Sequence, residues 1–333
     1  MTEGKRSVHA VWLGENDVAR LVSVVDAVAA VERGLRAEAS GGAHAMDKTY
    51  VAVQPGVTLQ ALGAAGRAFG LLGTKTWPQG LSSGSPVLVA FDAGSGSLRA
   101  VMAASLLSRL RTGALGGVAA KMLAREGVVD VAVIGSGRQA DTQVAAVAAV
   151  RQVRRLSVYS LTPANREAFA RRMADQLGIE AVACPSAEAA VKDADVVITI
   201  AKSQQPVLRG AWLKRGVHVN AVGVTIRGKR ELEDVVERAT VITADSVSGA
   251  RLLSDDLLGV LGDSGSAWAG VRRLCDLVAG GEGRPPDAGL TLYKGVGSGI
   301  ADVALAHAII ERAQATGLGQ MLADQTDVPL RLR

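Results

Sequence analysis

The clearest chemical signal in the chain is a glycine-rich turn that directly follows the apolar segment 128–134. The turn is Gly135-Ser136-Gly137-Arg138-Gln139-Ala140. The first glycine of such a motif permits a tight turn from strand to helix, the second lets the backbone approach a pyrophosphate, and a small third residue lets the helix pack closely. The helix N-terminus adds free N–H groups and a positive dipole. The spacing predicts dinucleotide binding, with a plain tight turn as the alternative interpretation.

The end of the next predicted strand bears on which dinucleotide the turn binds. An Asp or Glu there would read the ribose 2′-hydroxyl of NAD(H), but residues 159–162 include no carboxylate. Ser160, Thr162 and Arg166 offer hydroxyl donors and a positive charge to a 2′-phosphate instead. The sequence therefore favours NADP(H) over NAD(H) as the cofactor. The alternative interpretation of Thr162 is a cap for a helix that begins at Pro163.

Composition excludes several classes of protein. The chain has 333 residues, of which 48% are hydrophobic and 21% charged, so it can form one large core or two ordinary ones and is neither disordered nor a coiled coil. Its net charge of +5 comes without a long basic run or interleaved aromatic residues. A cofactor phosphate is therefore a better anionic ligand than a nucleic acid.

The cysteine, histidine and hydropathy patterns bear on disulfides, metal sites, membrane spans and the cellular compartment. Cys184 and Cys275 lack CxxC spacing, which excludes a disulfide scaffold or a thiolate metal site and indicates a reducing compartment. The four histidines lack ligand spacing, and His218 lies in an apolar strand, so we expect a core histidine and no metal. No apolar run is long enough for a membrane span. We expect a cytoplasmic protein that binds neither nucleic acid nor membrane.

From residue 128 onward, short apolar runs alternate with helical stretches. Buried parallel strands with helical crossovers have this pattern. The runs are 128–134, 156–159, 179–183, 195–200, 217–222 and 240–244. This part of the chain therefore predicts an α/β fold with a Rossmann-type doubly wound parallel sheet.

The first hundred residues show a different pattern, in which a helix around 18–39 precedes closely spaced strands. These strands are 48–53, 57–62, 71–77 and 86–92, with turns rich in Gly and Ser between them. They predict a mixed or antiparallel sheet, hence an α+β domain. A helix at 103–125 leads into the second part, and an amphipathic helix at 301–317 is expected to return to the first. We expect one domain of residues 1–113 with 301–333, and a dinucleotide-binding domain of residues 114–300.

Five motifs in order resemble the ornithine cyclodeaminase and mu-crystallin family over essentially the full chain. They are GTKTW (73–77), Leu110-Arg111-Thr112, the turn at 135–140, HVNAVG (218–223) and KGVGSGIAD (294–302). The resemblance implies an NAD(P)H-dependent oxidoreductase that interconverts an L-amino acid with its α-imino or α-keto acid, as an amino-acid dehydrogenase or imine reductase does. It also implies a homodimer, in which the first domain binds the substrate and contributes the contact between subunits.

The resemblance assigns roles to individual residues. Lys75 and Arg111 would be the catalytic residues and hold the substrate carboxylate near the nicotinamide, with Lys48 as a further positive charge. Trp77 would form a wall of the substrate pocket, although an aromatic residue at a strand end equally suits the core. Thr112 would face a cofactor phosphate. The remaining assignments are Gly297 for the substrate, and Ala201, Val222, Gly223 and Lys294 for the cofactor.

Two departures separate the chain from the cyclodeaminase pattern. Thr225 stands where the cyclodeaminase has an aspartate, and no acidic residue lies between Asp47 and Asp92, just upstream of the strand lysine. Without these carboxylates, a general acid or base for expelling ammonia is hard to supply, so imine reduction or amine oxidation is favoured. Two alternatives stay open: an NAD-dependent ornithine-type cyclodeaminase, and a non-catalytic nicotinamide-nucleotide or small-ligand binding protein of mu-crystallin type.

Overall fold

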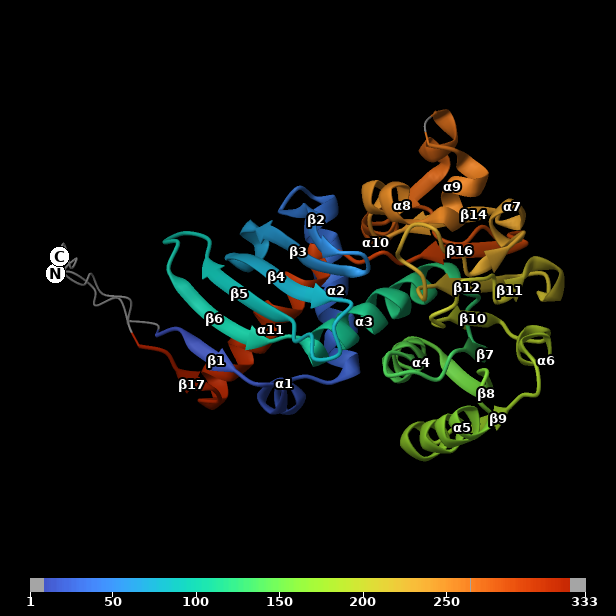
Figure 1. Cartoon of the computed structure of the whole chain (residues 1–333), viewed down its shortest axis with the longest axis horizontal. Helices are drawn as coiled ribbons and strands as arrows, with labels where there is room; N and C mark the ends of the chain where they lie inside the picture. The colour runs from blue at the N-terminus through green and yellow to red at the C-terminus, as the bar shows by residue number, and fades with distance from the viewer. Residues whose placement is uncertain (1–8, 264, 324–333) are drawn as a thin grey trace.

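The computed structural model describes residues 9–263 and 265–323, and it contains two large sheets with helices packed against them (Figure 1). The first is a seven-stranded mixed sheet in the order β17-β1-β6-β5-β4-β3-β2, in which β1 pairs in parallel with β6 and every other pair is antiparallel. Its strands are β1 (Val11–Leu13), β2 (Ala43–Gln54), β3 (Val57–Gly66), β4 (Leu71–Gln79), β5 (Val87–Asp92), β6 (Leu98–Ala103) and β17 (Gln320–Met321). The predicted mixed sheet is confirmed, and β1, β6 and β17 are additional strands.

The helix predicted around 18–39 is two helices, α1 (Glu15–Leu21) and α2 (Val24–Ala39). The break has a local cause in Ser23, which caps α2. Its Oγ accepts a hydrogen bond from the Asp26 backbone N–H at 3.2 Å, and its own N–H donates to the Asp26 carboxylate at 2.9 Å. This reciprocal capping box starts a new helix instead of continuing the old one.

One face of the mixed sheet is covered and the other is open. Along β4, Leu71, Gly73 and Lys75 are buried, whereas Leu72 and the other alternate residues are exposed, as the two-residue period of a strand requires. Helix α11 (Gly299–Thr316) packs on the covered face against β3 and β4, which confirms that the C-terminal helix returns to this sheet. The approach is so close that a Cβ at residue 299 would lie 1.8 Å from the Gly63 carbonyl oxygen.

The second sheet has eight parallel strands in the order β15-β14-β16-β12-β10-β7-β8-β9. They are β7 (Val128–Ile134), β8 (Gln152–Tyr159), β9 (Glu180–Ala183), β10 (Val196–Thr199), β12 (Val217–Ala221), β14 (Val241–Ala244), β15 (Val271–Arg273) and β16 (Leu290–Lys294). All six predicted strands are present, so the Rossmann-type sheet is confirmed. The chain proceeds from β7 to β8 on one side and returns to β10 on the other, which makes the carboxyl ends of β7 and β10 a topological switch point.

Helices cover the second sheet on both faces. They are α4 (Ala140–Ala148), α5 (Pro163–Leu177), α6 (Ala187–Val191), α7 (Val235–Arg238), α8 (Val247–Leu253), α9 (Asp255–Leu261) and α10 (Leu274–Val278). Short 3₁₀ turns are η1 (Arg67–Phe69), η2 (Gly210–Trp212) and η3 (Ser266–Gly270), and β11 (Leu208–Arg209) pairs with β13 (Leu232–Glu233) as a separate ribbon. Of the helices described, none is both long enough and apolar enough to cross a membrane.

Helix α3 (Ser105–Leu123) joins the two halves, because it packs against α2 and α11 on one side and against α4, β12 and β16 on the other (Figure 1). The predicted boundary between residues 113 and 114 falls within this helix and stays a prediction. Residues 1–8 and 324–333 of the predicted first domain lie outside the described residues.

His218 is a core residue, as predicted, and it helps to fix α3. Its Nδ1 lies 2.9 Å from Thr291 Oγ1 and its Nε2 lies 2.9 Å from Asn220 Oδ1, while the Asn220 amide donates to the Gly116 carbonyl of α3 at 3.0 Å. Burial lowers the pKa of His218 to about 4, which keeps the ring neutral. Both ring nitrogens are therefore used within the core.

Candidate active site

Two cationic side chains meet one carboxylate beneath the mixed sheet. Lys75 Nζ of β4 lies 2.7 Å from Asp302 Oδ1 of α11, and Arg111 Nε of α3 lies 3.2 Å from the same oxygen. The Lys75 and Asp302 side chains are only 2% and 0% exposed. The structure thus brings together the two residues predicted to be catalytic, around an acid that the sequence analysis did not select.

Asp302 is positioned by the start of α11. Ser298 caps this helix and its Oγ accepts a hydrogen bond from the Ile300 N–H at 3.2 Å, which places Asp302 in the first helical turn. Asp302 Oδ2 is buried and has no hydrogen-bond partner among the described residues. The available signal was its place as the last residue of the motif at 294–302.

The electrostatics of the cluster lower the pKa of two lysines. Burial and the neighbouring Arg111 guanidinium lower the pKa of Lys75 to about 8, against the opposing effect of Asp302. Burial and Arg111 likewise lower the pKa of Lys48 to about 8, while Asp245 and Asp302 oppose the change. Near neutral pH, both ammonium groups can therefore release a proton far more readily than an exposed lysine can.

Trp77 lies beside both lysines. Its ring centroid is 5.1 Å from Lys75 Nζ and 5.6 Å from Lys48 Nζ, within the range of cation–π contact. The indole is half-buried on the same face of β4 as Lys75. Trp77 thus lies at the predicted site, and its contact with substrate stays a prediction.

A second buried acid, Asp245, follows directly on β14. Its carboxylate accepts hydrogen bonds from the backbone N–H groups of Val296 at 2.9 Å and Gly297 at 2.8 Å, and from the Tyr293 hydroxyl. Burial nevertheless raises the pKa of Asp245 above its ordinary value. Gly297, held here with a φ of +99°, leaves room for Arg111, because a Cβ would lie 2.9 Å from Arg111 Nη1. The sequence analysis missed Asp245, although acids at the carboxyl ends of parallel strands are a usual signal.

These groups adjoin a cavity of about 830 Å³ between β2, α8 and the segment 296–299. Lys48, Asp245 and Gly297 line it, together with apolar side chains such as Leu62, and it is large enough for an amino acid. Lys75, Arg111 and Asp302 do not line the cavity themselves, but Gly297, which lines it, lies next to Arg111.

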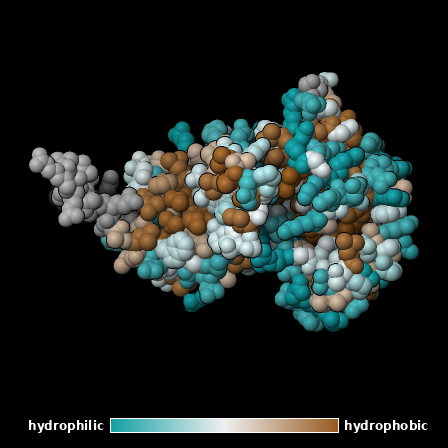
Figure 2. Space-filling model, viewed as in Figure 1, coloured by the Kyte–Doolittle hydropathy of each residue, from teal (hydrophilic) through white to brown (hydrophobic). Residues whose placement is uncertain are grey.

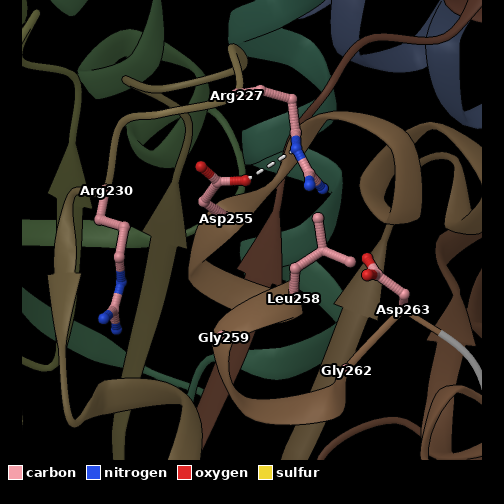
Figure 3. Close-up of a pocket in the computed structure, with 7 residues that line it drawn as sticks. All are labelled: Arg227, Arg230, Asp255, Leu258, Gly259, Gly262 and Asp263. Atoms are coloured by element: carbon pink, nitrogen blue, oxygen red, sulfur yellow. Dashed lines mark ion pairs between the residues drawn. The ribbon is translucent and has the colours of Figure 1, made fainter.

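A smaller hollow of about 400 Å³ lies between the segment 227–230 and α9 (Figure 3). It is lined by Arg227, Arg230, Asp255, Leu258, Gly259, Gly262 and Asp263. Arg227 and Asp255 form an ion pair at 3.1 Å across it. The hollow shares no lining residue with the larger cavity and includes none of the predicted site residues, so we do not place the active site there.

The glycine-rich turn has the geometry that its motif predicts. Gly135 has a φ of +119°, and a Cβ there would lie 2.9 Å from the backbone of Ile200. A Cβ on Gly137 would meet no atom within 4 Å, and residues 137–139 are exposed at the N-terminus of α4, while Ala140 is buried. Open backbone at a helix N-terminus is the setting that a pyrophosphate requires, so these residues fit a dinucleotide.

The turn lies next to the end of β8. Ser136 Oγ donates a hydrogen bond to Ser160 Oγ at 2.9 Å, and Arg166 Nη1 donates to the Ser160 carbonyl at 2.9 Å. The Arg166 guanidinium also lies 5.6 Å from the Tyr159 ring. Thr162 stands at the N-cap position of α5 but makes no side-chain cap bond, so its exposed hydroxyl is not used as a cap.

The other predicted cofactor residues divide into two groups. Ala201, Val222 and Gly223 lie together at the carboxyl ends of β10 and β12, where a Cβ on Gly223 would come within 2.6 Å of the Ala201 carbonyl oxygen. Thr112 is half-buried and donates its hydroxyl hydrogen bond to Ser108 of its own helix at 2.7 Å. The first group lies at the switch-point edge of the sheet, whereas the Thr112 hydroxyl is engaged within α3.

Lys294 is placed differently from the expectation. Its fully buried ammonium pairs with Glu231 Oε1 at 2.6 Å and Asp256 Oδ2 at 3.0 Å. Both contacts enclose the ammonium, so the structure argues against the expected direct contact between Lys294 and the cofactor. Thr225 is half-buried and supplies no carboxylate, but Asp245 and Asp302 provide two acids that the sequence analysis did not place in the site.

Comparisons with known proteins identify relatives that cover nearly the whole chain. The alanine dehydrogenase of Archaeoglobus fulgidus is 30% identical over 325 residues, which cover 93% of this chain and 97% of that protein. The structure of Thermococcus litoralis Δ1-pyrroline-2-carboxylate reductase in complex with NADH and L-proline is 30% identical, with a TM-score of 0.88 over 94% of this chain and 100% of that chain. An archaeal alanine dehydrogenase dimer with bound NAD is 29% identical, with a TM-score of 0.86 over 95% of this chain and 99% of that chain. Residues 8–317 match the model of the ornithine cyclodeaminase/mu-crystallin family, to which this chain therefore belongs.

Proposed function

We propose that the protein is a nicotinamide-dependent oxidoreductase that interconverts an L-amino acid with its α-imino or α-keto acid. The observation that carries the proposal is the buried cluster of Lys75, Arg111 and Asp302, next to a cavity of amino-acid size. The exposed glycine-rich turn supplies a place for the dinucleotide. The relatives described above are an amino-acid dehydrogenase and an imine reductase, which supports this class of reaction.

Arg111 and Lys48 are the groups best placed to bind the substrate carboxylate. The ion pair of Arg111 with Asp302 involves Nε, and the guanidinium also carries two terminal amino groups that can donate hydrogen bonds. Those amino groups face Gly297, which lines the cavity, and Lys48 lines it as well. A guanidinium and an ammonium that hold the carboxylate would fix the α-carbon, and positioning of this kind lowers the barrier substantially.

Lys75 is the candidate for moving a proton at the substrate nitrogen. When bound, the nicotinamide cofactor takes a hydride from the α-carbon or returns it. Removing hydride from an amino acid also requires loss of a proton from nitrogen, and reduction of the imine requires its gain. Lys75, with a pKa of about 8 and Asp302 against its ammonium, can accept or donate this proton near neutral pH.

We expect Lys75→Met to lower kcat by about 10²- to 10⁴-fold, because the proton donor is lost. Arg111→Met should lower kcat/KM by about 10²-fold or more through loss of the carboxylate contact. Cofactor affinity should change less than about threefold in both variants. Steady-state assays with amino acids, and with keto acids plus ammonia or methylamine, measure these effects while fluorescence titration follows the cofactor.

The matched control for this test is Arg109→Met, since Arg109 is on the same helix and makes a partly exposed ion pair with Asp141 at 3.5 Å. It should leave kinetics unchanged. Near-normal kcat/KM in the Lys75 or Arg111 variant would overturn the assignment. Ammonia release from ornithine without net cofactor turnover would select the cyclodeaminase alternative, and cofactor binding without any turnover would select the binding-protein alternative.

The lowered pKa of Lys75 predicts a pH dependence with a definite sign. Imine reduction needs the protonated lysine, so its kcat/KM should fall as pH rises through about 8, whereas amino-acid oxidation should rise to a plateau there. Asp302→Asn removes the anion that favours the ammonium, so both limbs should move to lower pH. Rate profiles from pH 6 to 10 measure this. A limb that stays in place or moves to higher pH in Asp302→Asn contradicts the role given to Lys75.

We also propose a modest preference for NADPH over NADH, about five- to fifty-fold in kcat/KM, or roughly 1–2 kcal/mol. Ser160 offers a hydroxyl where a carboxylate would repel a 2′-phosphate, and Arg166 lies next to it. Arg166→Ala should reduce the ratio of kcat/KM values for the two cofactors, and Ser160→Asp should reverse it. A parent ratio below one, or no change in either variant, would remove the phosphate site from the end of β8.

We propose that the subunits form a homodimer through the open face of the mixed sheet. Val51, Leu59, Leu72 and Phe91 of strands β2 to β5 are exposed, and hydrophobic side chains gather over this sheet in Figure 2. Exposed apolar patches of this kind mark protein interfaces, and one relative described above is a dimer.

Since both cysteines are buried and unpaired, we place the protein in the reducing cytoplasm.

Sedimentation velocity at micromolar concentration should therefore show a dimer. The double variant Leu72→Glu/Phe91→Glu should shift the protein to monomer. Leu72 and Phe91 are paired across β4 and β5, so dimer formation would bury two unpaired charges side by side in the interface. Val25→Glu changes a still more exposed apolar residue on α2 and should leave the dimer intact. A monomeric parent protein, or a double variant that remains dimeric, would contradict this interface.

A further inference from the structure

The backbone just after β12 is held by a buried carboxylate that lies outside the substrate site. Gly223 N–H donates to Glu231 Oε2 at 3.0 Å, and Val224 N–H donates to Glu231 Oε1 at 3.3 Å. Ala201 and Glu231 both crowd Gly223, since a Cβ there would lie 2.6 Å from the Ala201 carbonyl oxygen and 2.7 Å from Glu231 Oε2. The segment 223–224 is therefore fixed between β10 and Glu231.

Glu231 is in turn fixed by a closed set of partners. Its Oε2 also accepts the Thr199 hydroxyl at 2.7 Å, and its Oε1 accepts the Lys294 ammonium at 2.6 Å. Lys294 contacts Asp256 Oδ2 at 3.0 Å, while Asp256 Oδ1 accepts the Glu231 backbone N–H at 3.0 Å. All of these side chains are buried, so each carboxylate oxygen of Glu231 has two donors and the group cannot shift without losing them.

The cost of such a network indicates a purpose beyond packing. A buried ion-pair network contributes little net stability, and apolar side chains of similar volume often serve a core as well or better. Here the carboxylate accepts from two backbone N–H groups just after β12 and from the Thr199 hydroxyl at the end of β10, close to the switch point. Dinucleotides bind along this edge of a doubly wound sheet.

We propose that Glu231 is a positioning residue for the nicotinamide end of the cofactor, acting through the backbone of Gly223 and Val224 and held in place by Lys294 and Asp256. The inference rests on the proposed function for the identity of the cofactor. It gives Lys294 an indirect role in cofactor binding. The pyrophosphate end of the cofactor depends on the separate turn at 135–140.

Helix α9 offers an internal comparison, because its first two residues point in different directions. Asp256 faces inward to Lys294, whereas Asp255 pairs with Arg227 at 3.1 Å in the surface hollow of Figure 3. Both acids contact the segment that follows Val224. If general anchoring of this segment were sufficient, loss of either acid would have the same effect on the cofactor.

The test is Glu231→Gln, in which one acceptor oxygen is replaced by an amide NH₂ that cannot accept from its donors. Equilibrium titration with NADPH and NADH, followed by nicotinamide fluorescence, should give a Kd at least tenfold higher, with altered emission of the bound ring. KM for the amino or imino acid should stay within about twofold. Glu233→Gln, two residues along the chain in an exposed 3.0 Å ion pair with Arg209, and Asp255→Asn should leave the Kd unchanged.

A merely structural role makes a different prediction. The melting temperature of Glu231→Gln would fall, but the Kd and the emission of the bound ring would match the parent protein, and this outcome overturns the proposal. Should Glu231→Gln fail to fold, Thr199→Val removes a single donor at nearly constant volume: a Kd raised about two- to fivefold supports the proposal and an unchanged Kd overturns it. Because binding is measured without substrate, a parent protein that binds cofactor but turns over no amino or imino acid defeats the proposed function alone.

Discussion

The need to pair a buried ammonium is the constraint on which the substrate half of the molecule depends. Lys75 points to the covered face of the mixed sheet, where water does not compensate its charge. Its anion, Asp302, comes from 227 residues further along the chain. The C-terminal helix must therefore return to the first sheet, and it approaches the backbone of Gly63 closely enough only because Gly299 carries no side chain. The return of α11 to the first sheet, its close packing there and the position of Asp302 in the site thus all follow from the need to pair Lys75.

The two buried lysines show how the same pairing rule gives different chemistry. Lys75 has one carboxylate and a neighbouring guanidinium, and its pKa is lowered to about 8. Burial would lower the pKa of Lys294 as well, but Glu231 and Asp256 together outweigh it and raise that pKa. Lys75 can therefore exchange a proton, whereas Lys294 keeps its charge and holds its partners. The number of carboxylates around each ammonium thus accounts for the different roles proposed for the two lysines.

Sequence predicts best what is local. Six of the eight strands of the second sheet, the glycine-rich turn and the conformation of Gly135 follow from neighbouring residues and are as expected, whereas β15 and β16 were not predicted. Capping by Ser23 was also local, but it was obscured by an apolar pattern that continues through the break. Asp302 and Asp245 were missed because their roles depend on partners far along the chain. The expected contact of Lys294 with the cofactor failed for a related reason. A motif indicates which segment lies near a site, but it does not indicate where each side chain points.

Helix α3 links the substrate half to the cofactor half at the level of single residues. Arg111 meets Asp302, while the carbonyl of Thr112, the next residue, accepts the Gln143 amide of α4 at 2.9 Å. Consecutive residues of a helix point about 100° apart, so the rotation of α3 about its axis sets the distance from Arg111, the proposed carboxylate-binding group, to the turn at 135–140. Two hydrogen bonds of 3.0 Å to backbone carbonyls of α3 oppose that rotation. Asn220 donates one to Gly116, and Thr291 donates the other to Leu123. In the proposed reaction, hydride transfer would depend steeply on this distance, which a buried helix fixes instead of a loop.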